Sequence, residues 1–233
     1  MKKYEISRQK FIKRAIVFLL CLSISAGCVQ NASQNPVVKT NSESPLQRLL
    51  IGNKRFSSLH PIHPHATIEQ IRNAAKEQHP FAVIVACSDS RVSPELIFDE
   101  GIGDLFVIRT AGNIIGGLEI GSVEYAVEHL GVNLIFVMGH ENCGAVKAFI
   151  DGGEMHGHLK EIVDSIKLEA EIQAIPIDDV NRLNDCVIAN IRHGVKQLLL
   201  QSVIINERVR NKQIEIVGMR YDLDDLEVKI LNQ

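Results

Sequence analysis

Two short segments of the sequence carry side chains that are suited to binding a metal. The segments ACSDSR (86–91) and GHENCGA (139–145) each follow or end an apolar run, and they contain Cys87, His140 and Cys143. Thiolates and imidazole are ligands that zinc prefers in tetrahedral geometry. Three protein ligands with the fourth position left to water are typical of a catalytic zinc site. The two segments therefore predict a zinc site with one open position.

An acid and an arginine follow the first cysteine closely. Asp89 and Arg91 are two residues apart, so both side chains point the same way in extended backbone. Arginine can pair bidentately with a carboxylate and keep it ionised. An exposed ion pair contributes little to stability, but directly after a metal ligand this one favours a functional role. We expect Asp89 to accept a hydrogen bond from the zinc-bound water, or to replace that water as a ligand.

The elements that must position these side chains follow from the hydrophobic pattern. Apolar, β-branched runs at 81–86, 105–109, 134–139 and 214–219 predict strands that are buried on both faces, and 226–231 predicts an edge strand. Helical spacing occupies the intervals, at 45–58, at 67–78 with Thr67 as N-cap, at 117–131, and within 143–175 and 178–210.

This alternation predicts an α/β domain with a mostly parallel β-sheet core, of about four strands plus an edge strand, flanked by helices. Sites in open parallel sheets form beyond the carboxyl ends of the strands. Cys87 and His140 stand at the ends of two of these runs, and Cys143 follows three residues after His140. We therefore expect all three side chains to meet at one edge of the sheet.

Composition limits the classes of function. The chain has 233 residues, 45% of them hydrophobic and 23% charged, with a net charge of −3. These values are typical of a globular domain and give no electrostatic basis for binding nucleic acid. Of the five cysteines, Cys21 and Cys28 lie near the N-terminus, and the odd number that remains argues against a disulfide framework. Cys186 lies in the apolar run CVIANI and is expected in the core.

The N-terminus has the pattern of an export signal. Six of the 25 basic residues precede or adjoin an apolar run at 15–27, which is too short to span a bilayer comfortably. Cys28 follows the small pair Ala26-Gly27, which resembles a bacterial lipoprotein signal with Cys28 as the lipidated residue, although Ser25 stands where leucine is usual. An ordinary cleaved signal or an uncleaved anchor are the alternatives. The segment 7–13 resembles a twin-arginine signal with Gln9 in place of the second arginine.

This pattern divides the chain into three parts. We expect an export signal at 1–27, a polar tether at 28–44 and a folded domain at 45–233. The domain would lie on the periplasmic side of a bacterial membrane, held there only by the N-terminal lipid.

The segment CSDSR, the segment HENC 49 residues after Arg91, and the segment RTAGN at 109–113 together resemble a β-class carbonic anhydrase. The resemblance extends from about Leu46 to the C-terminal strand. It implies a four-stranded parallel core, and a homodimer or higher homo-oligomer with active sites near the subunit interface. It also implies one zinc ion per subunit with Cys87, His140 and Cys143 as ligands.

The same resemblance assigns further roles. Asp89 and Arg91 become the dyad that orients zinc-bound water, and in some members the equivalent of Asp89 binds zinc instead. Gln78 would hydrogen-bond substrate, and the backbone of Ala111 and Gly112 would line the pocket. Phe106 and Tyr125 fall at pocket positions, although a role as plain core aromatics is an equally good interpretation.

The chemistry that follows is hydration of carbon dioxide. Zinc lowers the pKa of bound water to ~7, so hydroxide forms at neutral pH and attacks CO2 to give bicarbonate and a proton. Three histidines could carry the proton to bulk water, and nothing in the sequence selects among them: His129, His156 and His158.

One departure from some family members concerns regulation. Some bacterial members inhibit themselves through a bicarbonate site built on a tryptophan three residues before the first zinc cysteine. Ile84 occupies that position here, and the chain has no tryptophan. We therefore predict the open type, with Asp89 paired to Arg91. Two other functions remain open: a hydrolase with Cys87 as nucleophile and His140 as base, and a non-catalytic zinc-binding lipoprotein.

Overall fold

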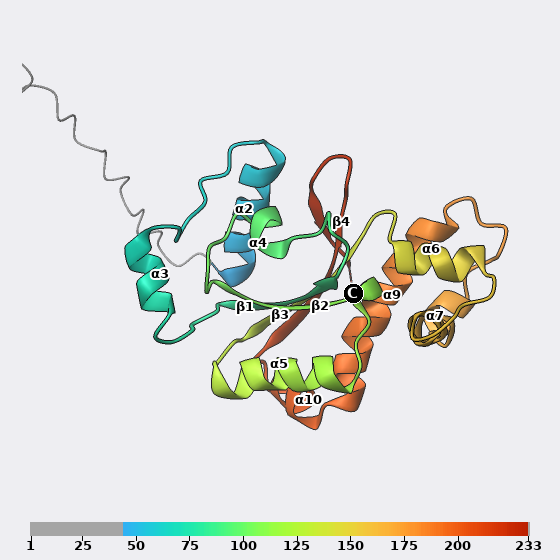
Figure 1. The fold of residues 1–233 in the computed structure, drawn as a ribbon. Coiled ribbons are helices and arrows are strands. Elements are labelled where there is room, and N and C mark those ends of the chain that lie inside the picture. The colour runs from blue at the N-terminus through green and yellow to red at the C-terminus, as the bar shows by residue number, and fades with distance from the viewer. Residues whose placement is uncertain (1–43, 233) are drawn as a thin grey trace, which may run out of the picture. The chain divides into compact units, whose positions relative to one another are not determined.

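The computed structural model describes residues 44–232, which form an α/β domain around a five-stranded sheet (Figure 1). The strand order is β2-β1-β3-β4-β5. Four strands are parallel and the short edge strand β5 is antiparallel, which confirms the predicted fold class. The strands are β1 (Ala82–Cys87), β2 (Leu105–Thr110), β3 (Leu134–His140), β4 (Glu215–Tyr221) and β5 (Val228–Ile230). The expected signal at 1–27, Cys28 and all of the tether but Ser44 lie outside the described residues.

Burial separates the central strands from the edge. Every residue of β1 and β3 is buried, as their unbroken apolar runs predict. The expectation for 105–109 was wrong, because β2 is only partly buried along its length. The reason is its place at the edge of the sheet, where only β1 pairs with it.

Helices cover both faces of the sheet (Figure 1). One face carries α5 (Gly117–His129), α9 (Arg182–Gln201) and α10 (Val203–Arg210), and the other carries α2 (Pro45–Ser57) and the short α4 (Pro94–Ile97). Successive strand residues point to opposite faces, so β1 supplies Val83 to the first core and Ile84 to the second. Because alternate side chains of β1 point to opposite faces, the strand packs against both helical layers.

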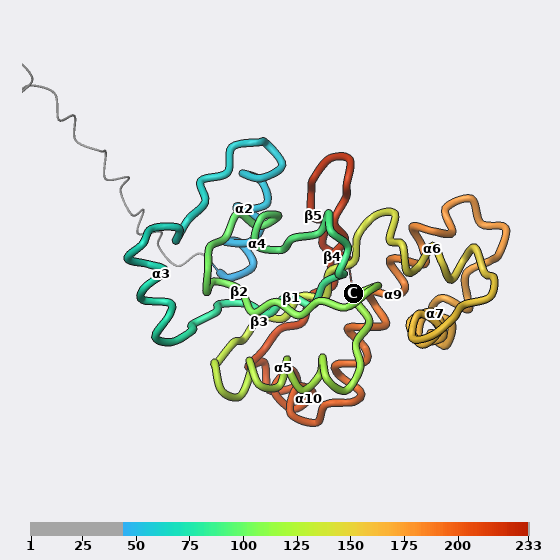
Figure 2. Tube along the Cα trace, viewed as in Figure 1, coloured from blue at the N-terminus to red at the C-terminus, as the bar shows by residue number. Residues whose placement is uncertain are grey.

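The remaining helices are α3 (Ile68–Ala74), the 3-10 helix η1 (Ala111–Asn113), α6 (Gly144–Asp151), α7 (Leu159–Lys167) and α8 (Ala170–Gln173). The trace in Figure 2 places α6 and α7 together at one end of the sheet, where α6 follows directly from the end of β3. The short helices α4 and η1 have too few residues to produce a periodic signal, so the sequence did not predict them.

The predicted N-cap at Thr67 is confirmed, and its side chain forms a capping box with Gln70. The helix nevertheless ends at Ala74 rather than continuing to 78. None of its residues is buried, so no tertiary packing extends it beyond the first two turns.

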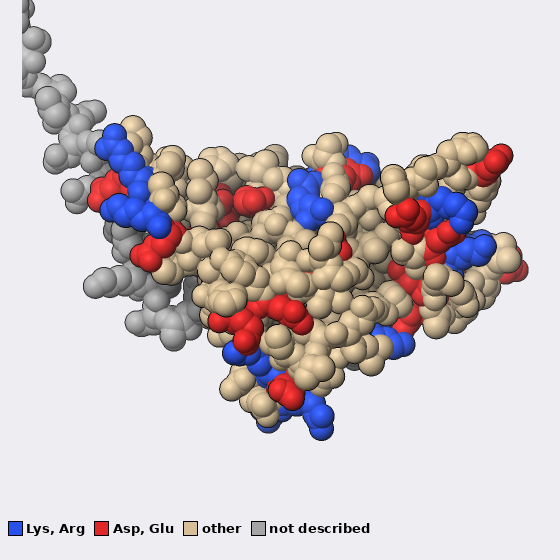
Figure 3. Space-filling model, turned by 60° about the horizontal axis from the view of Figure 1, so that its bottom comes forward, with Lys and Arg blue, Asp and Glu red and all other residues tan. Residues whose placement is uncertain are grey.

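The surface carries charges of both signs. Basic and acidic side chains are interspersed on the face that Figure 3 shows. Among the described residues, no helix combines the length and the apolar character needed to cross a bilayer.

Candidate metal centre

The structure brings Cys87, His140 and Cys143 together at the carboxyl ends of β1 and β3. Their sulfur and nitrogen ligand atoms all lie within 4.8 Å of one another. All three residues are buried, and each cysteine is at most 4% exposed. Asn142 adopts a left-handed backbone (φ 52°), which turns the chain so that Cys143 becomes the N-cap of α6. Two sulfur atoms and one imidazole nitrogen therefore converge at the edge of the sheet that the strand pattern predicted.

The imidazole of His140 has a defined tautomer. Its Nδ1 lies 2.8 Å from the carbonyl oxygen of Glu141, which can only accept, so Nδ1 carries the proton. The other ring nitrogen, Nε2, is fully buried and finds no hydrogen-bond partner within residues 44–232. A buried nitrogen lone pair without a partner, beside two sulfurs, fits a metal ligand better than a core histidine.

The two thiols share one environment. The Cys143 thiol donates a hydrogen bond to Cys87, and this holds the pKa of Cys87 well below its usual range. The backbone N–H of Gly112 also donates to the Cys87 sulfur at 3.3 Å. The pKa of Cys143 is raised, because its proton serves that bond and because the side chain is buried. Cys87 is therefore the more acidic of the two thiols.

Asp89 and Arg91 form the bidentate pair that their spacing predicts. Arg91 Nε and Nη2 lie 2.9 and 2.8 Å from the two carboxylate oxygens. This pairing holds the pKa of the Asp89 carboxyl well below its usual range. Asp89 Oδ2 also lies 3.9 Å from Nε2 of His140, so an ionised oxygen faces the ligand atoms.

Arg109, the first residue of the RTAGN segment, is a positioning residue. Its guanidinium donates to the backbone carbonyls of Cys87, at 3.0 Å, and of Asp89, at 2.7 Å. One side chain from β2 thus fixes the segment that carries both Cys87 and Asp89. Its place at the end of a predicted strand, next to the strand of Cys87, was the signal available in the sequence.

Asn190 is a second positioning residue, and no pattern in the sequence predicts this role. Its Nδ2 donates to the carbonyl oxygen of Gly112 at 2.7 Å, across 78 residues of chain. Gly112 has a left-handed backbone (φ 71°), and an added Cβ would lie 3.0 Å from that of Ala145. The bond from Asn190 holds this turn so that the Gly112 N–H faces Cys87.

The structure brings some of the other predicted pocket residues to the cluster and leaves others away from it. Ala111 and Gly112 lie in η1, beside the cluster. Phe106 pairs with Val83, four residues before Cys87, which is roughly 13 Å along the strand. Gln78 precedes the first residue of β1, which puts it beyond the opposite end of that strand.

Tyr125 lies on α5 and packs against Phe106, with 6.1 Å between ring centroids. Tyr125 is 45% exposed. The three candidate carriers of the proton, His129, His156 and His158, are all exposed. Cys186 lies on α9 and is fully buried in the core on that side of the sheet, as expected.

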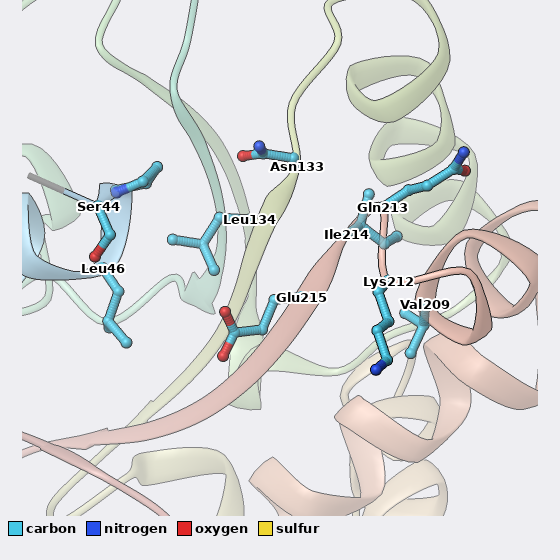
Figure 4. Close-up of a pocket in the computed structure, with 10 residues that line it drawn as sticks. Ser44, Leu46, Asn133, Leu134, Val209, Lys212, Gln213, Ile214 and Glu215 are labelled. Atoms are coloured by element: carbon cyan, nitrogen blue, oxygen red, sulfur yellow. The ribbon is translucent and has the colours of Figure 1, made fainter. Parts of the chain in front are cut away.

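A cavity lies away from the metal centre, at the amino ends of the parallel strands. It has a volume of about 460 Å³ and is lined by Ser44, Leu46 and the first residues of β3 and β4, as Figure 4 shows. These are the amino ends of the two parallel strands, opposite the edge that carries the cluster. Its volume alone therefore does not make it the reactive site.

Comparison with known proteins agrees with this geometry. The family model for carbonic anhydrase matches residues 82–228. "Carbonic anhydrase 2" of Mycobacterium tuberculosis is 38% identical over 190 residues, covering 80% of this chain and 91% of that protein. The carbonic anhydrase of Mycolicibacterium smegmatis is 37% identical over 195 residues, covering 82% and 94%.

Solved structures agree as well. The β-carbonic anhydrase CcaA is 30% identical with a TM-score of 0.62, covering 80% of this chain and 95% of that one. One of the tetrameric β-carbonic anhydrases of Sordaria macrospora is 27% identical with a TM-score of 0.63, covering 82% and 98%. The chain therefore belongs to the carbonic anhydrase family. Within that family it is an enzyme of the β class, which confirms the resemblance carried by the three motifs.

Proposed function

We propose that this enzyme hydrates carbon dioxide reversibly to bicarbonate and a proton with one zinc ion held by Cys87, His140 and Cys143. The observation that carries the proposal is the buried, unpartnered Nε2 of His140 within 4.8 Å of two thiol sulfurs. A nitrogen and two sulfurs form a donor set that zinc prefers. When bound, zinc would supply the Lewis acidity that makes a nucleophile from water at neutral pH.

The residues around the cluster have separate tasks. Arg91 keeps Asp89 ionised and fixes both carboxylate oxygens, so that Asp89 can accept a hydrogen bond from a reacting water and orient it. Burial of the ligands and the closed turn of η1 keep bulk water from the sulfurs. Arg109 and Asn190 hold the two backbone segments that present these groups. The pairing of Asp89 with Arg91 supports the open type of site.

A direct test compares two buried cysteines. Cys143→Ala should lose both zinc and stopped-flow CO2 hydration, measured on the same sample. Cys186→Ala is the matched control, because this cysteine is equally buried but lies outside the cluster. It should keep one zinc ion per subunit and its activity. Full activity in zinc-free protein would contradict the proposal.

The two rival functions give different results in the same assays. A Cys87 nucleophile would hydrolyse esters without metal and would be alkylated in the zinc-loaded protein. A zinc-storage protein would bind the ion and show no CO2 hydration. The ionised Asp89 facing the ligand atoms favours the anhydrase over both.

We further propose that the protein works as a homodimer or higher homo-oligomer. Solved tetrameric relatives support this. So does the position of the predicted pocket residues: Gln78 and Phe106 lie toward the amino ends of β1 and β2, away from the cluster at the carboxyl ends, and Tyr125 on α5 packs against Phe106. If these residues contact substrate, they do so in the site of a second copy packed along the exposed β2 edge. Their partial exposure, on an edge strand and on α5, fits that role.

The N-terminal pattern leads us to propose export and lipidation at Cys28, which would hold the enzyme on the periplasmic side of a bacterial membrane. The basic residues before the run at 15–27 and the small pair before Cys28 support it. Expression with a radiolabelled fatty acid should label the wild-type chain. Cys28→Ser should abolish the label, whereas Cys21→Ser should leave it unchanged.

A further inference from the structure

The imidazole of His140 depends on a short turn near the surface. Its Nδ1 lies 2.8 Å from the carbonyl oxygen of Glu141, and this contact sets the tautomer that leaves Nε2 free beside the two sulfurs. Glu141 and Asn142 lie between the end of β3 and the start of α6, and Asn142 is exposed. Exposed segments with few buried contacts open locally at little cost in free energy. The position of the Glu141 carbonyl therefore needs an anchor elsewhere in the fold.

The loop between β4 and β5 supplies this anchor. The backbone N–H of Glu141 donates to the carbonyl oxygen of Tyr221 at 2.9 Å, which continues the pairing of His140 with Tyr221 in the sheet. The Glu141 carboxylate accepts a hydrogen bond from the backbone N–H of Leu223 at 3.2 Å, across 82 residues of chain. Figure 1 shows this loop beside the segment that leaves β3. The backbone and the side chain of Glu141 therefore both hold the turn against one loop.

The loop has a defined shape of its own. Nη1 of Arg220 lies 2.9 Å from Oδ2 of Asp222, and Nη2 of Arg220 lies within ion-pair distance of Glu141, at 3.8 Å. Asp222 also accepts from the backbone N–H of Asp224 at 3.1 Å. The side chains of Arg220 and Asp222 are only 13% and 15% exposed, so these charged contacts are partly shielded from water. The Leu223 N–H is thus presented to Glu141 from a fixed support.

We propose that Glu141 is a positioning residue for the metal centre. Its carboxylate holds the turn so that its own carbonyl accepts from Nδ1 of His140 and the lone pair of Nε2 faces the two sulfurs. A partner on the second nitrogen of a metal-binding histidine fixes the tautomer and the ring, and it raises the basicity of the ligand. This role requires a hydrogen-bond acceptor at residue 141 rather than a charge. The inference rests on the proposed function, because it concerns how the chain presents one proposed zinc ligand.

Three variants of the full-length chain separate this role from general stability. Glu141→Met removes the acceptor, whereas Glu141→Gln keeps a carbonyl oxygen for the Leu223 N–H. Glu119→Met is the matched control, because the Glu119 carboxylate also accepts one backbone N–H, from Gly116 at 3.0 Å, at the start of α5. Each methionine variant loses one such bond, so both should lower the Tm by a similar few degrees.

Two measurements report on His140 itself. Zinc should pass to an excess of chelator about tenfold faster from Glu141→Met than from the wild-type chain. The rate for Glu141→Gln should stay within about threefold of wild type, and the rate for Glu119→Met should equal it. Nitrogen NMR of the zinc-free, histidine-labelled chain should place the His140 proton on Nδ1 in the wild type and in Glu141→Gln. Glu141→Met should show both tautomers, and His140→Ala assigns the signal.

The outcomes separate this inference from the proposed function. Zinc release at the wild-type rate from Glu141→Met, or an unchanged His140 tautomer in that variant, overturns the inference. Equally fast release from Glu119→Met overturns it too, because the effect would then follow stability alone. A wild-type chain that binds no zinc contradicts the proposed function, and the tautomer of His140 in the zinc-free variants then decides the role of Glu141.

Discussion

Arg109 donates a hydrogen bond from Nε to the backbone carbonyl of Cys87 at 3.0 Å, and the same guanidinium reaches the carbonyl of Asp89 at 2.7 Å. A single side chain on a neighbouring strand therefore fixes the distance between Cys87, a proposed metal ligand, and Asp89, the acid proposed to serve it. Geometry of this kind matters because misplacing a reacting group by about 1 Å can lower a rate about 10²-fold.

The first prediction concerns this contact. Lysine cannot reach two carbonyls with a planar fork, so Arg109→Lys should lower kcat/KM by about 10–10²-fold. Stopped-flow CO2 hydration measures the loss, and atomic absorption should show zinc retained. Arg72→Lys, on the exposed surface of α3, is the control and should keep full activity. Unchanged activity in Arg109→Lys would show that the segment holds its shape without the clamp.

The second prediction concerns Asp89. Asparagine keeps the shape but removes the charge that Arg91 stabilises, so Asp89→Asn should lower kcat by about 10²-fold or more while zinc stays bound. Asp151→Asn, at an exposed ion pair on α6, is the control. Wild-type kcat in Asp89→Asn would contradict the proposed role of the Asp89–Arg91 pair, but it would not contradict the proposed zinc site.

The third prediction concerns pH and Glu169. Burial, and to a lesser extent the charge of Glu171, raises the pKa of Glu169 from its ordinary value of 4.5 to about 8. Because the folded state binds this proton more tightly, its contribution to stability is full below about pH 4.5 and is lost as the pH rises to about 8. Glu169→Gln removes that loss.

Calorimetry at several pH values checks this. The Tm of Glu169→Gln should exceed that of the wild-type chain by about 4 °C or more at pH 8.5, and the difference should shrink toward pH 5. Glu154→Gln should follow the wild-type curve throughout, because that side chain is exposed. A Tm difference that does not change with pH would mean that Glu169 keeps an ordinary pKa in the folded protein.

The fourth prediction tests whether Gln78 serves the site of its own chain or the site of a second copy. Cys143→Ala and Gln78→Ala should each have low activity alone. If Gln78 serves the site of a second copy, refolding the two variants together should restore about a quarter of wild-type activity, because half of the dimers are mixed and each has one intact site. If Gln78 acts within its own chain, mixing should restore nothing.

Much of the architecture was readable from local patterns. The runs at 81–86 and 134–139 predicted β1 and β3 nearly to the residue, since strands that are buried on both faces need unbroken apolar sequence. The capping residue of α3 was predicted for the same local reason. The length of α3 and the partial burial of β2 were not, because both depend on which neighbours pack against these elements.

The sequence by itself determined which side chains the proposed chemistry uses. The spacing of Cys87, His140 and Cys143 after two buried strands, with Asp89 and Arg91 beside them, identified the donor set and the acid. Tertiary structure alone decided the rest: the His140 tautomer, the hydrogen bonds from Arg109 and Asn190 to the backbone, and the burial of Glu169. The physical reason is range. Residue types and short spacings are enough to indicate which side chains could bind a metal. The contacts that orient and bury these side chains join segments that are far apart in sequence, so they form only when the chain folds.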